Sequence, residues 1–242
     1  MQRVLITAAA VCLLAACGDS SISQPDTTPP DTATPPPDPI TPASFDVSAT
    51  NLTLGQPLSP LAVLIHDSGQ AVFRIGETAS AGLELLAEGG DNSGLLDEID
   101  GAAEASGGGP IGPGGSETLT LELADDQTDG LSLSVISMLV NTNDAITGLN
   151  GIPLADMAVG DSMTYSAVAY DAGTEANNEL AGTIPGPADG GEGFNAMRDD
   201  VGDFVTMHPG VVTADDGLSL SVLNQMHRFD NPVIRITVTR TQ

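Results

Sequence analysis

Carboxylate and amide side chains gather in one short segment, YDAGTEANNE, at residues 170–179. Asp171, Glu175 and Glu179 recur at every fourth position, and Asn177 adds a side-chain oxygen. Carboxylates held this close raise one another's pKa values unless water, a cation or a positively charged partner compensates them. The segment is therefore interpreted either as solvated surface or as part of a cation site.

A second turn of similar chemistry follows the apolar run SMLV. Residues 141–148, NTNDAITG, carry Asp144 together with amide and hydroxyl oxygens. If both turns leave strands at the same end of a β-sandwich, their carboxylates can converge on one hard cation. Calcium suits such a site because it takes roughly six to eight oxygen ligands and tolerates irregular loops. Gly173 allows the bend that turns Asp171 and Glu175 toward the same point.

Known catalytic motifs are incomplete in this chain. Gly160-Asp161-Ser162 is similar to the start of an esterase block, but no Asp stands three positions before any of the histidines, so the catalytic partner is missing. Neither a GxSxG nor an HExxH sequence occurs. Residues 125–130 begin like an EF-hand loop, yet Ile136 occupies the position of the bidentate Glu. The histidines are interpreted as turn or core residues rather than as a zinc site.

The first residues have the pattern of an export signal. One Arg and an apolar run, too short to span a bilayer, are followed by small residues that end at Cys17. Leu14-Ala15-Ala16-Cys17 resembles the lipobox of bacterial lipoprotein precursors, in which the Cys is lipidated and becomes the mature N-terminus. Gly18 follows, and we expect an outer-membrane anchor, with the protein facing the periplasm or the cell surface.

The rest of the chain divides into a tether and one domain. Residues 18–44 contain eight of the seventeen prolines and are expected to be disordered. Residues 45–242 are long enough for a single domain. Both cysteines, Cys12 and Cys17, lie in the signal segment, so this domain has no disulfide.

The charge of the chain argues against nucleic acid as a partner. Thirty-three acidic residues stand against six Arg and no Lys, which gives a formal net charge of −27. Such a surface repels phosphates, so nucleic-acid binding is not expected. Membrane attachment through a basic patch is not expected either, which leaves that role to the lipidated Cys17.

Short apolar stretches between Gly-rich turns predict an all-β domain, an antiparallel β-sandwich. Two short helices are expected in connecting loops, at 80–88 and 93–99. The expected strands lie at 45–49, 61–66, 71–75, 118–123, 134–140, 163–170 and 234–238.

Several runs together resemble the spondin domain, the module of F-spondin, mindin and many bacterial exported proteins. The similarity extends over essentially all of residues 45–240 and is carried by LTLGQPLSPLAVLIHDSGQAVFRIGETASAGLELLAEGGD, SMLVNTNDAITGLNGIPL, YDAGTEANNE, HPGVV and NPVIRITVTR. It implies a β-sandwich like the calcium-dependent lipid-binding domains, with one calcium ion.

The resemblance also implies a ligand set for the calcium ion. Matched residue by residue, the ligands are Asp144, Asp171 and Glu175, while Asn177 and Glu179 are weaker candidates. Glu175 replaces the Asp of the family pattern, and Ala145 stands in place of a Trp. With these differences the resemblance still implies the metal site, but it does not imply the partner binding of the animal proteins.

Three functions are compatible with these features. The first is a non-catalytic, calcium-binding lipoprotein that acts in binding or adhesion, with a glycan or a protein as ligand. The second is a structural envelope protein without a discrete ligand. The third is an envelope hydrolase that uses carboxylates such as Glu175 and Glu192, since paired carboxylates can do acid/base chemistry.

Overall fold

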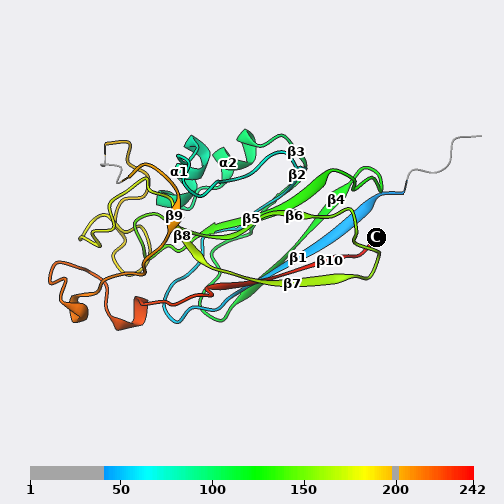
Figure 1. The fold of residues 1–242 in the computed structure, drawn as a ribbon. Coiled ribbons are helices and arrows are strands. Elements are labelled where there is room, and N and C mark those ends of the chain that lie inside the picture. Colours follow the sequence, from blue (N-terminus) through cyan, green and yellow to red (C-terminus); the bar gives the residue numbers. More distant parts are fainter. Residues whose placement is uncertain (1–40, 198–201) are drawn as a thin grey trace, which may run out of the picture. The chain divides into compact units, whose positions relative to one another are not determined.

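The fold is an antiparallel β-sandwich, as the sequence predicts. A computed structural model describes residues 41–197 and 202–242. Within this part, two antiparallel sheets of four and six strands pack face to face (Figure 1). The expected signal segment, lipidated Cys17 and most of the tether lie outside the described residues. The first strand begins at Ala43, two residues ahead of the expected start of the domain.

The four-stranded sheet has the order β4-β1-β10-β7. Side chains alternate between its faces, so that apolar residues such as Phe45 and Val47 face the other sheet and are buried. Its strands are β4 (Ser116–Leu123), β1 (Ala43–Asn51), β10 (Ile234–Arg240) and β7 (Ser162–Ala167).

The six-stranded sheet has the order β3-β2-β5-β6-β8-β9. Its central strand β5 is almost wholly buried, because the other sheet covers one face and helices cover part of the other. Its strands are β3 (Gly101–Ser106), β2 (Ala62–Asp67), β5 (Leu131–Met138), β6 (Ala145–Pro153), β8 (Ala169–Asp171) and β9 (Thr206–Met207).

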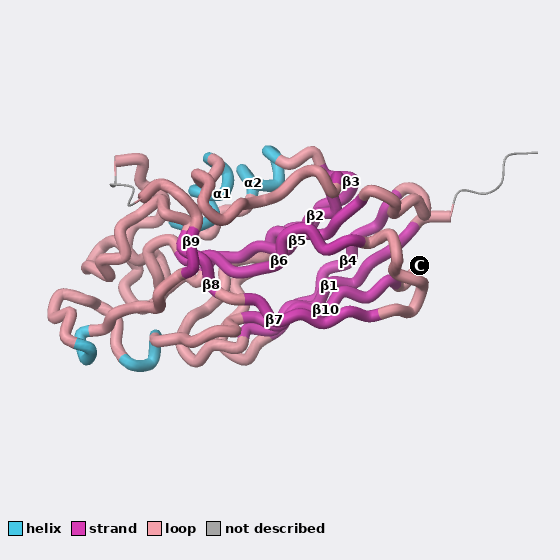
Figure 2. Tube along the Cα trace, viewed as in Figure 1, coloured by secondary structure: helices cyan, strands magenta, loops and turns pink. Residues whose placement is uncertain are grey.

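Two hydrophobic clusters hold these layers together. One fills the space between the sheets, and the second lies between the outer face of the six-stranded sheet and the helices α1 (Ala81–Gly89) and α2 (Ser93–Glu98). Ser80 caps α1 by accepting a hydrogen bond from the backbone N–H of Leu83 (3.2 Å), as its position in the sequence suggests. Figure 2 shows both helices on one side of the sandwich.

Long loops gather at the end of the sandwich where β8 and β9 lie, at the left in Figure 1. Two 3-10 helices, η1 (Ala214–Asp216) and η2 (Gln225–His227), and a small apolar cluster order part of these loops. Within the described residues, no helix is long and apolar enough to cross a membrane.

Two of the expected strands differ in the structure. Residues 71–75 form a loop, because Asn150 binds the backbone of Val72 and Phe73 in place of a neighbouring strand. Residues 163–170 form two strands rather than one, since β7 pairs with β10 whereas β8 pairs with β6 in the other sheet. The sequence pattern does not predict β3, β6 or the two-residue strand β9.

Candidate metal centre

Three neighbouring strands bring together the residues of a candidate metal centre. Asp144 stands directly before β6, Asp171 is the last residue of β8, and His208 follows β9. In the β6-β8-β9 register Ala145 pairs with Asp171, and the backbone N–H of His208 donates to the carbonyl of Ala169 (3.1 Å). Asp171 pairs with Thr206 of β9, and His208 stands two residues after Thr206, so alternation along the strand places Asp171 and His208 on the same face.

The three side chains lie close enough to share one ion. One ligand atom of each residue, a carboxylate oxygen of Asp144 and Asp171 and a ring nitrogen of His208, lies within 4.8 Å of the others. Calcium binds oxygen at roughly 2.3–2.6 Å, so two atoms that hold one ion lie at most about 5 Å apart. The cluster can therefore hold a metal ion.

The two oxygens of Asp144 have different surroundings. Oδ2 accepts hydrogen bonds from the backbone N–H groups of Thr174 (2.9 Å) and Glu175 (3.1 Å). Oδ1 is buried and has no hydrogen-bond partner among the described residues. Burial, and next the charge of Asp171, raise the pKa of Asp144 to about 7, against the effect of the two backbone donors. A buried carboxylate oxygen without a partner is a position that a cation could fill.

Asp171 is held by its own turn. Oδ1 accepts from the backbone N–H of Gly173 (2.8 Å), and Oδ2 accepts from the side-chain amide of Asn177. Gly173 has φ +75°, and a Cβ there would lie 2.5 Å from the carbonyl oxygen of Phe204. The turn therefore requires glycine. Asn177, a weaker candidate ligand, contacts Asp171 through its side-chain nitrogen.

His208, which the sequence pattern indicates to be a turn or core residue, is a member of the cluster. Its ring is 5% exposed and packs against Phe229, with ring centroids 5.4 Å apart. Nδ1 accepts from the backbone N–H of Gly210 (3.0 Å), whereas Nε2 has no hydrogen-bond partner in the described part of the chain. Burial lowers the pKa of His208 to about 4, so the ring is neutral at neutral pH.

The other predicted ligands lie beside the cluster rather than in it. Glu175 is 2% exposed; its carboxylate accepts from the side-chain amide of Asn143 (3.1 Å), and it is not one of the residues whose ligand atoms converge. Glu179 is also buried, and one of its oxygens accepts from the backbone N–H of Val212 (3.0 Å). Burial raises the pKa of Glu179. Glu192, the expected partner of Glu175 in a hydrolase, is exposed.

A network of buried amides fixes the turn that carries Asp144. Gln56, which has no exposed surface, donates to the carbonyls of Asn141 (3.1 Å) and His227 (2.7 Å) and accepts from the backbone N–H of Asn141 (3.1 Å). The side chain of Asn141 in turn binds Gly55 and Ala188. Four loops are thus joined at the base of the candidate centre.

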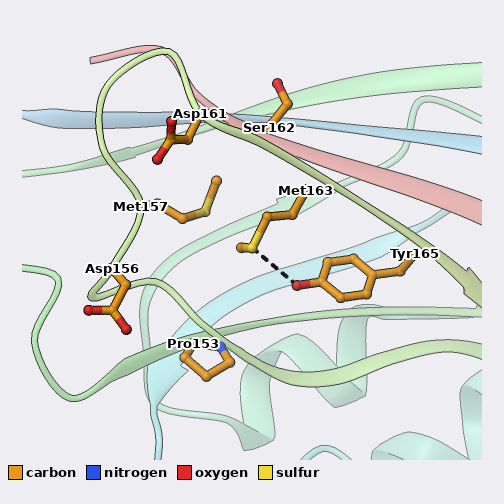
Figure 3. Close-up of a pocket in the computed structure, with 7 residues that line it drawn as sticks. All are labelled: Pro153, Asp156, Met157, Asp161, Ser162, Met163 and Tyr165. Atoms are coloured by element: carbon orange, nitrogen blue, oxygen red, sulfur yellow. Dashed lines mark hydrogen bonds between the residues drawn. The ribbon is translucent and has the colours of Figure 1, made fainter.

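A separate pocket lies at the far end of β6, which begins beside Asp144 and ends at Pro153 (Figure 3). Its volume is about 420 Å³, and the hydroxyl of Tyr165 donates to the sulfur of Met163 (3.3 Å). Ser162 of the esterase-like triplet lines it but is hydrogen-bonded to Thr239 (2.7 Å). The lining residues include no histidine, so the Ser–His pair of such an esterase is not formed here.

No protein-family model matches the chain, and no curated protein matches it. Membership of the spondin family is therefore a hypothesis that rests on the sequence runs given above.

Proposed function

We propose that this domain is the non-catalytic, calcium-binding module of an exported lipoprotein, and that it acts in binding or adhesion at the bacterial cell envelope. One observation supports it most: two carboxylates converge at the loop end, and the buried oxygen of Asp144 has no partner in the described residues. A divalent cation would satisfy that oxygen and remove the repulsion between Asp144 and Asp171.

Calcium is the proposed ion because oxygen ligands predominate and the surrounding loops are irregular. A bound ion would link the β5–β6 turn to the ends of β8 and β9. It would stabilise a domain in which both cysteines precede the first strand and no disulfide forms. Extracellular calcium modules bind with dissociation constants of order 0.1–1 mM. When the free calcium concentration is a hundred times the dissociation constant, binding would add about 2.7 kcal/mol to the free energy of unfolding.

The proposed partner chemistry follows from the resemblance and from charge. The resemblance to spondin domains implies adhesion to a glycan or a protein, and a net charge of −27 disfavours nucleic acid and other polyanions as ligands. Lipidation at Cys17 would hold the domain at the outer membrane.

Thermal melting of the chain from Gly18 onward tests the metal site. Calcium should raise the melting temperature by roughly 5–10 °C, magnesium by less, and a chelator should reverse the effect. Asp171→Asn should abolish the shift, while Asp126→Asn, at an exposed loop position, should retain it. A shift of equal size in both variants, or none in the unaltered chain, would refute calcium binding at this centre.

Partner binding is tested separately on a glycan array and by pull-down from envelope extracts. We expect capture that depends on calcium and is lost in Asp171→Asn. Capture that persists in the presence of a chelator would show that partner binding does not depend on the metal site.

A further inference from the structure

The hydrogen bond between Gly210 and His208 fixes the position of the ring proton. The backbone N–H of Gly210 donates to Nδ1 of His208 at 3.0 Å. A donor can approach Nδ1 in this way when that nitrogen carries a lone pair, so in the neutral ring the proton resides on Nε2.

The turn after β9 makes this arrangement rigid. Gly210 has φ +89°, a conformation that L side chains rarely adopt, and Phe229 packs against the ring. A flip of the imidazole would lose the hydrogen bond from Gly210. The backbone therefore selects the tautomer of His208.

Because Nδ1 accepts from Gly210, Nε2 is the ring nitrogen left to interact with the carboxylates of the cluster. Nε2 is buried without a hydrogen-bond partner among the residues that the structure describes, and so is Oδ1 of Asp144. In this tautomer Nε2 of His208 is a hydrogen-bond donor, and Oδ1 of the ionised Asp144 is an acceptor. A group between them that accepts from Nε2 and attracts a carboxylate would satisfy both.

A metal-ligating histidine has the opposite pattern. Its ligating nitrogen carries the lone pair, and its other nitrogen donates to a carbonyl, a carboxylate or water. In His208 the second nitrogen accepts instead of donating. Zinc, which favours histidine nitrogen, would have to reverse the tautomer and lose the bond from Gly210.

We propose that His208 serves the centre as a hydrogen-bond donor to an oxygen that coordinates the ion, and not as a nitrogen ligand, so that the centre selects hard, oxygen-binding cations over zinc. This inference rests on the proposed calcium function and adds the role of His208 to it. The coordinating oxygen belongs to a carboxylate of the cluster or to water on the ion.

Long-range ¹H–¹⁵N NMR of the mature chain reads the tautomer directly. We expect His208 to carry its proton on Nε2 without metal and in the presence of calcium. His227 is the internal reference: its Nδ1 also accepts from a backbone N–H, that of Asn224 (3.1 Å), so it should show the same tautomer and no response to calcium. A proton on Nδ1 of His208 in either state overturns the inference.

Titration calorimetry with calcium and with zinc tests the proposed selectivity and the contribution of the His208 donor. His208→Leu removes the donor and should weaken calcium binding roughly tenfold or more, because hydrogen bonds to charged groups are strong. His208→Gln keeps an N–H donor and should weaken it less than threefold. His227→Gln should have no effect, and zinc should bind no tighter than calcium.

The outcomes separate the two proposals. If calcium binds but zinc binds more tightly, and if that zinc binding disappears in both His208→Gln and His208→Leu, histidine is a ligand and the inference fails while the metal site stands. If neither ion binds the unaltered chain, the calcium function fails, and the selectivity proposed here fails with it.

Discussion

Asp144 has one oxygen held by two backbone donors and one oxygen without a partner among the described residues. Replacement by Asn keeps an acceptor for the N–H groups of Thr174 and Glu175 and removes a buried negative charge next to Asp171. In the presence of a chelator, Asp144→Asn should therefore melt a few degrees higher than the unaltered chain. It should show no response to calcium. Scanning calorimetry with chelator and with calcium measures both effects, and a lower melting temperature in chelator would contradict the account of Asp144.

The raised pKa of Asp144 predicts a dependence on pH. Its pKa of about 7 exceeds the ordinary value near 3.9, so between these values the folded state binds a proton that the unfolded state has lost. Without metal, the stability contributed by this proton is present at low pH and is lost as the pH rises toward 7. His208, with its lowered pKa, acts in the opposite direction.

A comparison of the unaltered chain with the Asp144→Asn variant isolates the contribution of Asp144, because His208 is present in both. In chelator, the free energy of unfolding of the unaltered chain should fall relative to the variant between about pH 4 and pH 7. Saturating calcium should reverse this trend, since the ion binds the deprotonated carboxylate and competes with the proton. Urea unfolding at several pH values measures it. A difference that does not vary with pH would show that Asp144 is not protonated in this range.

The sequence predicted some of these residues and missed one. Asp144 and Asp171 stand out because each is a carboxylate in a turn that follows an apolar run. His208 gives no such signal, since HPG has the composition of an ordinary turn. Its place in the cluster depends on the pairing of the two-residue strand β9 with β8, which is a tertiary event without a local pattern. Likewise, the spacing of four between Asp171 and Glu175 does not reveal that Glu175 binds Asn143.

At the scale of elements, the turn after β8 depends on Gly173. A Cβ at this position would meet the backbone of Phe204 at 2.5–3.0 Å and would also require φ +75°. Gly173→Ala should displace the turn and abolish the calcium-dependent shift in melting temperature. Gly182→Ala is the matched control, because its φ is +90° but nothing lies within 4 Å of the added methyl group. The control should lose roughly 1–2 kcal/mol of stability and keep its response to calcium. Equal responses to calcium in the two variants would mean that the turn tolerates the collision.

The amide network under the centre should be a large source of stability. Gln56→Leu would leave the buried backbone N–H and carbonyl of Asn141, and the partly buried carbonyl of His227, without their partner. Each buried group left unpaired costs about 1–3 kcal/mol. We expect a loss of at least about 2 kcal/mol in urea unfolding. Gln70→Leu, at an exposed position, should change stability by less than about 0.5 kcal/mol. Similar values for the two variants would show that the network contributes little.

The sequence predicts the strands whose alternation of apolar and polar residues follows from one buried and one exposed face. It does not predict the segments whose structure depends on contacts with distant residues. β1, β4 and β10 alternate because one face of their sheet is buried and the other is not. Residues 71–75 have an apolar pattern because Val72 and Phe73 enter the cluster beneath the helices, although no strand forms there. The six-residue sequence GLSLSV, which occurs twice in the chain, also shows that distant contacts decide whether a strand forms. Its first copy, at 130–135, leads into the central strand β5, whereas the second, at 217–222, lies in a loop.

At the scale of the whole molecule, an excess of negative charge acts on the domain together with the candidate centre. A net charge of −27 destabilises the compact state through self-repulsion, and salt screens it. The Debye length falls from about 10 Å at 0.1 M ionic strength to about 3 Å at 1 M. General screening and specific binding should therefore differ in the concentration that each requires.

Sodium chloride between about 0.1 and 1 M should raise the melting temperatures of the unaltered chain and of Asp171→Asn by similar amounts, gradually and without saturation. Calcium at millimolar concentration should raise the melting temperature of the unaltered chain far more than that of the variant, and the effect should saturate. Melting curves at matched ionic strength distinguish the two effects, because a shared rise reports screening and a difference reports the centre. If Asp171→Asn responds to millimolar calcium as fully as the unaltered chain, calcium acts on the acidic surface as a whole, and the convergence of Asp144, Asp171 and His208 serves some other purpose.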